Sequence, residues 1–314
     1  MTVVLFFLLL ILSIFIIFVT TAFSYTFVRH QKKGINDISS PVNKFLNIQK
    51  EMANSGIFFI ENAPHERVYI KSHDNLKLSA RFYPNTNARG TIILFHGYRA
   101  SSSREFCCTI KMYYEAGLNV LLVDQRSHGE SEGKLITFGI KESVDAVSWV
   151  QYVCQRCGKH SPIFLGGLSM GATTVMTATG RKLPKNVCGI IADCGFTSAH
   201  EIISLVAKKR FHFSPTFLIR LFDIICRVFG KFSIYEYDTT DILKSNKIPI
   251  FFIHGKADSF VPCYMSERNF KANLGEKQIT LIDEARHGHS FLIAPERLTK
   301  EIQNFISAHI PNNI

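Results

Sequence analysis

The chain has 314 residues, of which 46% are hydrophobic and 19% are charged, and its formal net charge is +11. This composition suits a packed core and excludes a disordered chain. The excess of positive charge can attract anionic substrates or lipid head groups, but the sequence has no run of five basic residues and no nucleic-acid-binding motif, so no nucleic acid is expected as a partner.

The N-terminal segment is apolar. Residues 1–28 carry no charge, and the first charged side chain is Arg29. Because such a run can cross a bilayer core of ~30 Å as a helix, residues 1–28 are predicted to form a retained transmembrane anchor. The alternative is a cleaved signal peptide, with Ala22-Phe23-Ser24 as the cleavage site, but no basic segment precedes the run. The basic residues Arg29, Lys32 and Lys33 favour a cytoplasmic location for the rest of the chain.

Eight cysteines are scattered along the sequence without the spacing of a disulfide framework, which favours a reducing compartment. Cys154-Gln-Arg-Cys157 is a lone CxxC without a second pair, so it is a weak zinc signal. The cysteines are interpreted as small buried hydrophobes, and no metal or cofactor is expected.

Residues 29–63 are polar and predict a linker between the anchor and a domain that spans residues 64–314. In this domain apolar runs alternate with helical patterns, which indicates βαβ units and a mostly parallel sheet with flanking helices. The predicted strands are 67–71, 76–82, 91–95, 119–123, 162–168, 188–192, 249–253 and 278–282, and the predicted helices are 103–116, 138–152, 170–180 and 296–308. Residues 198–247 break the alternation and predict a helical insertion over the carboxyl edge of the sheet.

A G-x-S-x-G motif occurs at residues 167–171, directly after a predicted strand and before a predicted helix. This strand–turn–helix context is what a nucleophile elbow requires, because Gly167 and Gly171 allow a sharp turn that presents Ser169 at the edge of the sheet. Ser169 is therefore the predicted nucleophile. The alternative is an ordinary serine in a glycine-rich turn.

A serine hydroxyl needs a base to remove its proton. On a nucleophile elbow the base is a histidine late in the chain, after the acid. His287 follows the predicted strand 278–282 and is the predicted base, with His289 as the rival.

Five motifs in this order resemble the α/β-hydrolase superfamily, and specifically its branch of serine-aminopeptidase-like and monoacylglycerol-lipase-like enzymes. The motifs are Leu94-Phe95-His96-Gly97, Val123-Asp124-Gln125-Arg126-Ser127-His128-Gly129-Glu130-Ser131, Gly167-Leu168-Ser169-Met170-Gly171, Ile253-His254-Gly255-Lys256-Ala257-Asp258-Ser259-Phe260-Val261-Pro262, and His287. The resemblance covers roughly residues 68–310. It implies the α/β-hydrolase fold, but it does not name a substrate.

The resemblance also implies an oxyanion hole. The backbone amide of Tyr98, after His96 and Gly97, would be one donor, and the amide of Met170 would be the other. His96 is then a turn residue, and Asp124 and His128 have structural roles because they precede Ser169 in the chain.

The predicted triad acid is Asp258, which lies in the motif that carries the acid in the families this chain resembles. Asp193 is the alternative, since it also follows a predicted strand at the same edge of the sheet. A carboxylate is needed here because it fixes the tautomer of the base and stabilises the imidazolium.

The predicted activity is hydrolysis of an ester, a thioester or a small amide through an acyl-enzyme, on a small acyl ester or lipid-derived substrate at a membrane. The aromatic residues of the insertion predict either a partly apolar lid over the substrate or a segment whose rings only pack against the core, and they are Phe211, Phe213, Phe217, Phe222 and Phe229. An aminopeptidase-like peptidase is the enzymatic alternative. A non-catalytic membrane-bound binding module on the same fold is the alternative of a different class.

Overall fold

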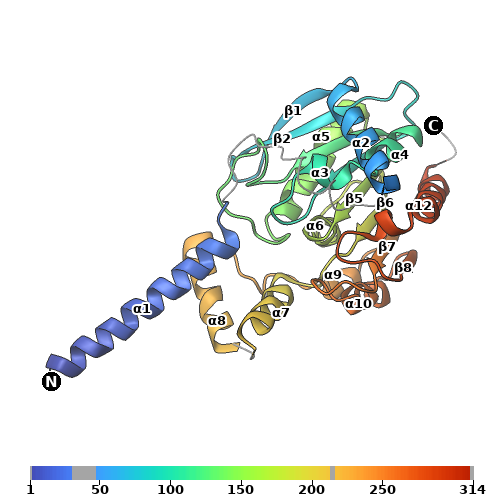
Figure 1. Cartoon of the computed structure of the whole chain (residues 1–314). Helices are drawn as coiled ribbons and strands as arrows, with labels where there is room; N and C mark the ends of the chain where they lie inside the picture. Colours follow the sequence, from blue (N-terminus) through green and yellow to red (C-terminus); the bar gives the residue numbers. More distant parts are fainter. Residues whose placement is uncertain (1, 30–46, 213–215, 312–314) are drawn as a thin grey trace.

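The computed structural model describes residues 2–29, 47–212 and 216–311. An eight-stranded sheet forms its centre, in the order β1-β2-β4-β3-β5-β6-β7-β8 (Figure 1). The strands are β1 (Glu66–Lys71), β2 (Lys77–Tyr83), β3 (Thr91–Phe95), β4 (Asn119–Asp124), β5 (Ile163–Leu168), β6 (Val187–Asp193), β7 (Ile250–Gly255) and β8 (Lys277–Ile282). Strand β2 is antiparallel to both of its neighbours, and the other pairs are parallel. The predicted α/β-hydrolase sheet is confirmed.

Helices cover both faces of this sheet. One face packs against α2 (Asn47–Asn62), α3 (Ser102–Phe106), α4 (Ile110–Glu115), α11 (Ser290–Ile293) and α12 (Pro295–His309). The other face packs against α5 (Glu142–Cys157), α6 (Met170–Ala178), α9 (Thr239–Leu243) and α10 (Tyr264–Ala272). Strands β3 and β4 are buried along their whole length, which explains why they are continuous apolar runs in the sequence.

Two predicted helices differ from the structure. The predicted helix 103–116 is split into α3 and α4, and α2 packs tightly against the split, since a Cβ on Gly56 would lie 1.5 Å from the Cys107 carbonyl oxygen. The predicted helix 138–152 begins only at Glu142, because Phe138 and Gly139 have φ values of 55° and 97°, which no helix accommodates. Helix α10 was not predicted.

The predicted linker 29–63 also differs from the structure. Its second half is helix α2, in which Ala53 and Ile60 are fully buried against the domain. The Tyr83 hydroxyl donates to the Ile60 carbonyl at 2.8 Å and ties this helix to β2. The folded unit therefore includes residues before 64, whereas Lys32 and Lys33 lie outside the described residues.

Helix α1 (Thr2–Phe27) extends away from the sheet, with α7 (Ala199–Phe211) and α8 (Thr216–Ile225) near its C-terminal part (Figure 1). Among the described helices, α1 alone is long and apolar enough to cross a membrane, a test that a signal sequence would also pass. Aromatic rings join α1 to the insertion, and the rings of Phe27 and Phe222 stack at 5.3 Å. Phe213 lies outside the described residues.

Candidate active site

Ser169 occupies a strained turn between β5 and α6, with φ 55° and ψ −116°. The flanking glycines leave no room for side chains: a Cβ on Gly167 would lie 2.3 Å from the Gly171 backbone, and a Cβ on Gly171 would lie 1.8 Å from the Phe95 carbonyl oxygen. The turn is held by the Ser169 amide, which donates to the Asp193 carbonyl at 2.8 Å. The G-x-S-x-G pattern thus reflects close backbone contact at the carboxyl edge of the sheet.

The structure brings Ser169, His287 and Asp258 into one hydrogen-bonded chain. Nε2 of His287 lies 2.9 Å from Oγ of Ser169, and Nδ1 of His287 lies 2.7 Å from Oδ2 of Asp258. Because a carboxylate only accepts, Nδ1 carries the proton, and Nε2 is left to accept from the serine hydroxyl. This is the arrangement in which an imidazole can remove the proton of a serine.

Asp258 is held in its ionised form. Its Oδ1 accepts the backbone N–H groups of Phe260 and Val261 at 2.8 and 2.9 Å, and His254 lies 3.2 Å from its Oδ2. Burial raises the pKa of Asp258, but the hydrogen bonds from His254 and His287 outweigh it and hold the pKa well below its usual range. The carboxylate is therefore charged across the physiological pH range.

His254 supports this acid and was not singled out as a site residue from the sequence. Its side chain is fully buried, and its Nε2 faces two acceptors, the Asp258 carboxylate and the Val261 carbonyl at 2.9 Å. Nε2 therefore carries the proton, and the hydroxyl of Ser266 donates to Nδ1 at 2.6 Å. The only sequence signal was its position at the end of β7, four residues before Asp258.

Asp193 and His289, the alternative candidates for the acid and the base, have other neighbours. Asp193, at the end of β6, accepts the Ser290 hydroxyl at 3.2 Å, and burial raises its pKa to about 6. His289 directly precedes the short helix α11, and burial lowers its pKa. It is His287, and not His289, that bonds to the Ser169 oxygen.

The loop after β3, residues 97–99, lies beside Ser169. Two buried histidines support it: Nδ1 of His96 donates to the Gly97 carbonyl at 2.8 Å, and Nε2 of His128 accepts the Arg99 amide at 3.0 Å. The Tyr98 amide has no protein acceptor among the described residues. The Met170 amide begins α6, where an N–H lacks a partner within the helix. The Tyr98 amide therefore lies in this loop beside Ser169, and the Met170 amide directly follows Ser169 in the chain.

Glu105 is a further side chain at this loop, and its place in the first turn of a helix was its only signal in the sequence. Its Oε2 accepts the Gly97 amide at 2.5 Å. Both its carboxylate and the Ser169 Cβ lie within 3.4 Å of the point where a Gly97 Cβ would stand. Burial raises the pKa of Glu105 to about 7, although the Gly97 hydrogen bond acts in the opposite direction.

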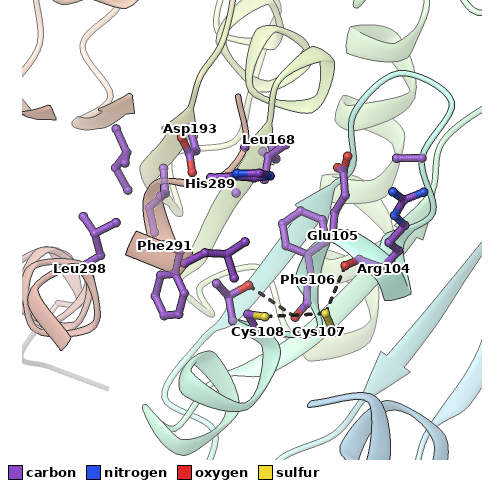
Figure 2. Close-up of a pocket in the computed structure, with 18 of the residues that line it drawn as sticks. Arg104, Glu105, Phe106, Cys107, Cys108, Leu168, Asp193, His289, Phe291 and Leu298 are labelled. Carbon is purple, nitrogen blue, oxygen red and sulfur yellow. Dashed lines mark hydrogen bonds between the residues drawn. The ribbon is translucent and has the colours of Figure 1, made fainter. Parts of the chain in front are cut away.

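A cavity of about 330 Å³ adjoins the site (Figure 2). Leu168 and His287 form part of its wall near the nucleophile, and polar groups there include Glu105 and Asp193. The apolar part of its lining comes from α2, the α3–α4 segment, β6, β7, α11 and α12, with Phe106, Cys107, Cys108, Ile191, Ile253, Phe291 and Leu298 among the residues.

The insertion was expected to form an apolar lid over the substrate, but no described residue of 198–247 lines this cavity. The insertion instead packs against Met170 and the end of α1, in a cluster that also contains Phe138. Its aromatic residues divide into two groups. Phe222 is buried, whereas Phe211, Phe217 and Phe229 are exposed.

Two groups of described residues have the spacing to hold a metal ion: Cys194 with Asp258 and His287, and His73 with Asp74 and Asp145. In the first, the Asp258–His287 hydrogen bond already occupies the ligand atoms. In the second, Arg126 forms bidentate hydrogen bonds with both aspartates. Neither Cys154 nor Cys157 belongs to such a group.

Comparison with known proteins agrees with this architecture. The model of the serine aminopeptidase (S33) family matches residues 86–240, which include the elbow. An esterase from Pyrococcus furiosus, Pf2001, superposes with a TM-score of 0.63 at 25% identity, over 81% of this chain and 96% of the esterase. This chain is a member of the α/β-hydrolase superfamily.

The curated relatives of this hydrolase include the uncharacterised protein YqkD of Bacillus subtilis, which is 25% identical over 69% of this chain and 70% of its own length. An uncharacterised membrane protein of Saccharomyces cerevisiae, YNL320W, is 23% identical over 63% of this chain and 64% of its own length. The hydrolase therefore has an esterase- or peptidase-like fold, with an N-terminal apolar helix that is a candidate membrane anchor.

Proposed function

We propose that this hydrolase is a membrane-anchored serine esterase that uses Ser169 as nucleophile, His287 as base and Asp258 as the acid that orients the base. The observation that carries the proposal is the continuous hydrogen-bonded chain from Asp258 through His287 to the Ser169 hydroxyl, at 2.7 and 2.9 Å. A serine with only a structural role in a turn would need neither these hydrogen bonds nor the strained backbone at Ser169.

The first half of the reaction acylates the enzyme. Oγ of Ser169 bonds to the carbonyl carbon of the ester while its proton passes to Nε2 of His287, and the carbonyl electron pair moves onto the oxygen. The amides of Tyr98 and Met170 bind this oxyanion, each worth on the order of 3 kcal/mol of barrier. The bond to the alcohol then breaks, and the alcohol leaves with the proton from Nε2.

The second half releases the acyl group. His287 takes a proton from water as the water oxygen bonds to the acyl carbon, and the same two amides bind the second oxyanion. Collapse breaks the bond to Oγ, frees the carboxylic acid and returns the proton to Ser169. Asp258, ionised throughout, stabilises the imidazolium in both halves. The chemistry calls for no metal ion or cofactor.

The cavity beside His287 supports an acyl-ester substrate. The apolar part of its lining favours burial of a hydrocarbon chain, at roughly 0.8 kcal/mol for each methylene group removed from water. An anchor in the bilayer would keep the site close to lipid-derived esters. These features together favour a substrate with a short or medium acyl chain.

Peptidase activity on a small aminoacyl amide is the second candidate. The S33 family model and the two carboxyl groups of Glu105 and Asp193 in the cavity wall favour it, because carboxylates can bind a free amino group.

A hydrolysis screen tests both activities. Purified full-length protein in detergent is given p-nitrophenyl esters of increasing chain length and, in parallel, aminoacyl p-nitroanilides. We expect kcat/KM to rise with acyl length to an optimum, with little amide cleavage. Higher kcat/KM for the aminoacyl amides would establish the peptidase, and no turnover of either class, with an unreactive Ser169, would establish the binding module.

A further inference from the structure

The end of helix α1 contacts the loop that carries the proposed oxyanion donor. The Tyr98 hydroxyl donates to the Thr26 carbonyl at 2.7 Å. The neighbouring Arg99 guanidinium donates to the Tyr25 carbonyl and, at 3.4 Å, to the Val28 carbonyl. The last carbonyls of a helix lack partners within the helix and carry the negative end of its dipole, so a hydroxyl and a guanidinium are well suited to cap them.

The same end of α1 is fixed to the folded domain on its other side. Phe27 is fully buried, and its carbonyl accepts the Ile136 amide at 2.8 Å. The Arg29 amide donates to the Lys134 carbonyl at 2.8 Å, and the Arg29 guanidinium donates to the carbonyls of Ser131 and Gly129. The last turn of the candidate anchor is therefore part of the domain and not a free tether.

These contacts act on a loop whose other amides are already bound. The Gly97 amide is held by Glu105 and the Arg99 amide by His128, which leaves Tyr98 between them. The Tyr98 ring stacks on Phe138 at 5.0 Å, and Phe138 in turn contacts the Phe27 ring at 5.6 Å. Burial raises the pKa of Tyr98 to about 12, so its hydroxyl remains a donor at working pH.

We propose that the C-terminal turn of α1 is a positioning element of the active site: by binding the side chains of Tyr98 and Arg99, it fixes the direction of the Tyr98 amide toward the oxyanion. This inference rests on the proposed serine esterase activity. It gives the helix a second role besides attachment, because loss or displacement of its last turn slows the chemical step even with a soluble substrate.

The test compares two tyrosine-to-phenylalanine variants in full-length protein in detergent. Tyr98→Phe removes only the hydroxyl that binds Thr26 and keeps the backbone amide. Tyr83→Phe is the matched control, because its hydroxyl makes the same kind of bond, to the Ile60 carbonyl of α2, away from this loop. Each variant is assayed for kcat and KM on a short water-soluble p-nitrophenyl ester.

We expect Tyr98→Phe to lower kcat by about tenfold with KM nearly unchanged, which is less than the 10²–10³ cost of removing a direct oxyanion donor. Tyr83→Phe should keep the wild-type kcat. Arg99→Ala should resemble Tyr98→Phe, and Arg99→Lys should recover part of the loss because it keeps a cation at the helix end. Melting temperatures measured in the same detergent separate this effect from unfolding.

Wild-type kcat in Tyr98→Phe would overturn the inference, whatever the effect of Arg99→Ala. An equal loss in Tyr83→Phe would also overturn it, because the effect would then be general destabilisation. Ser169→Ala is assayed alongside: if that variant keeps its activity, the proposed function itself is wrong, whereas an inactive Ser169→Ala with a fully active Tyr98→Phe rejects only the role of α1.

Discussion

The Glu105 carboxylate accepts the backbone amide of Gly97 at 2.5 Å, one residue before the amide proposed to bind the oxyanion. The contact has two opposing effects. The hydrogen bond holds the loop in place, but a negative charge beside Ser169 opposes the negative charge that develops on the substrate oxygen. Since burial raises the pKa of this carboxyl to about 7, its charge changes within the range in which the enzyme would work.

Glu105→Gln should therefore change the pH dependence of the reaction. The amide oxygen of Gln still accepts the Gly97 amide but never becomes charged. Below about pH 6 the wild-type carboxyl is protonated, so the two proteins should have similar kcat/KM, and above about pH 8 the variant should be several-fold faster. The measurement is the ratio of kcat/KM, variant over wild type, across this range.

The ratio removes the effects of pH that both proteins share. Arg104 and Asp193 also face Glu105 and act in opposite directions on its pKa, so neutral variants of each serve as controls for the midpoint. A ratio that stays constant with pH would show that the charge on Glu105 does not reach the reaction centre.

The ionisation of Glu105 should also make the stability of the folded protein depend on pH. The pKa of Glu105 is higher in the folded protein than in the unfolded chain, so its contribution to stability is complete below the unfolded value of about 4.5 and is lost as pH rises through about 7. Glu105→Gln should raise the melting temperature relative to wild type at about pH 8 more than at about pH 5. A constant difference would contradict this linkage.

The two candidate acids should differ strongly on substitution. Asp258→Asn should lower kcat by 10³–10⁴-fold, because the histidine would be held in the wrong tautomer. Asp193→Asn should cost far less, since Asp193 binds Ser290 and not His287. Steady-state kinetics with a chromogenic ester would distinguish them, and the reverse order of effects would assign the acid to the end of β6.

The exposed side of the insertion should contact the membrane. Phe217 and Phe229 are 75% and 70% exposed on the part of the chain that packs against α1, and Lys208 and Arg210 are exposed nearby. Lys209 differs from its neighbours, because its ammonium group binds the carbonyl of Ser259, next to Asp258. We therefore expect Lys208→Ala with Arg210→Ala to reduce activity on anionic vesicles more than on a soluble ester.

Lys209→Ala is the contrasting variant, and it should affect both substrates because it loosens the loop that carries the acid. Phe217→Ser with Phe229→Ser should reduce activity on neutral vesicles as well, since apolar contact with lipid does not depend on lipid charge. If the Lys208/Arg210 variant lost activity equally on both substrates, these side chains would be ordinary solvated surface.

Much of the site could be predicted from local sequence, because its parts depend on local geometry. The glycines around Ser169 are needed within one turn, and Asp258 and His287 lie in the loops after β7 and β8, whose carboxyl ends meet at one edge of the sheet. The elbow could thus be recognised from five residues. The contacts of Thr26 with Tyr98 and of Gly97 with Glu105 depend on how distant or irregular segments pack, and no periodicity encodes them.

The packing of distant segments also explains why the structure of α2 and of the insertion differs from the prediction. Helix α2 was predicted as a linker because its polar side dominates its composition, yet its other side buries Ala53 and Ile60 against the domain. The aromatic residues of the insertion suggested a substrate lid, but hydrophobicity alone does not say whether a ring meets substrate, the anchor or lipid. The position of the cavity between α2, α3–α4 and α12 follows only from the assembled layers.

Ser169 is identified as an activated nucleophile if a fluorophosphonate adduct, mapped by mass spectrometry, lies on its hydroxyl. Full-length protein in detergent is treated with the probe, digested and sequenced, with Ser169→Ala as the control. We predict one adduct, on Ser169, no labelling of the variant, and less than about a hundredth of wild-type ester hydrolysis in it. Modification of a different residue, or hydrolysis by Ser169→Ala at a rate near wild type, would show that Ser169 is not the nucleophile.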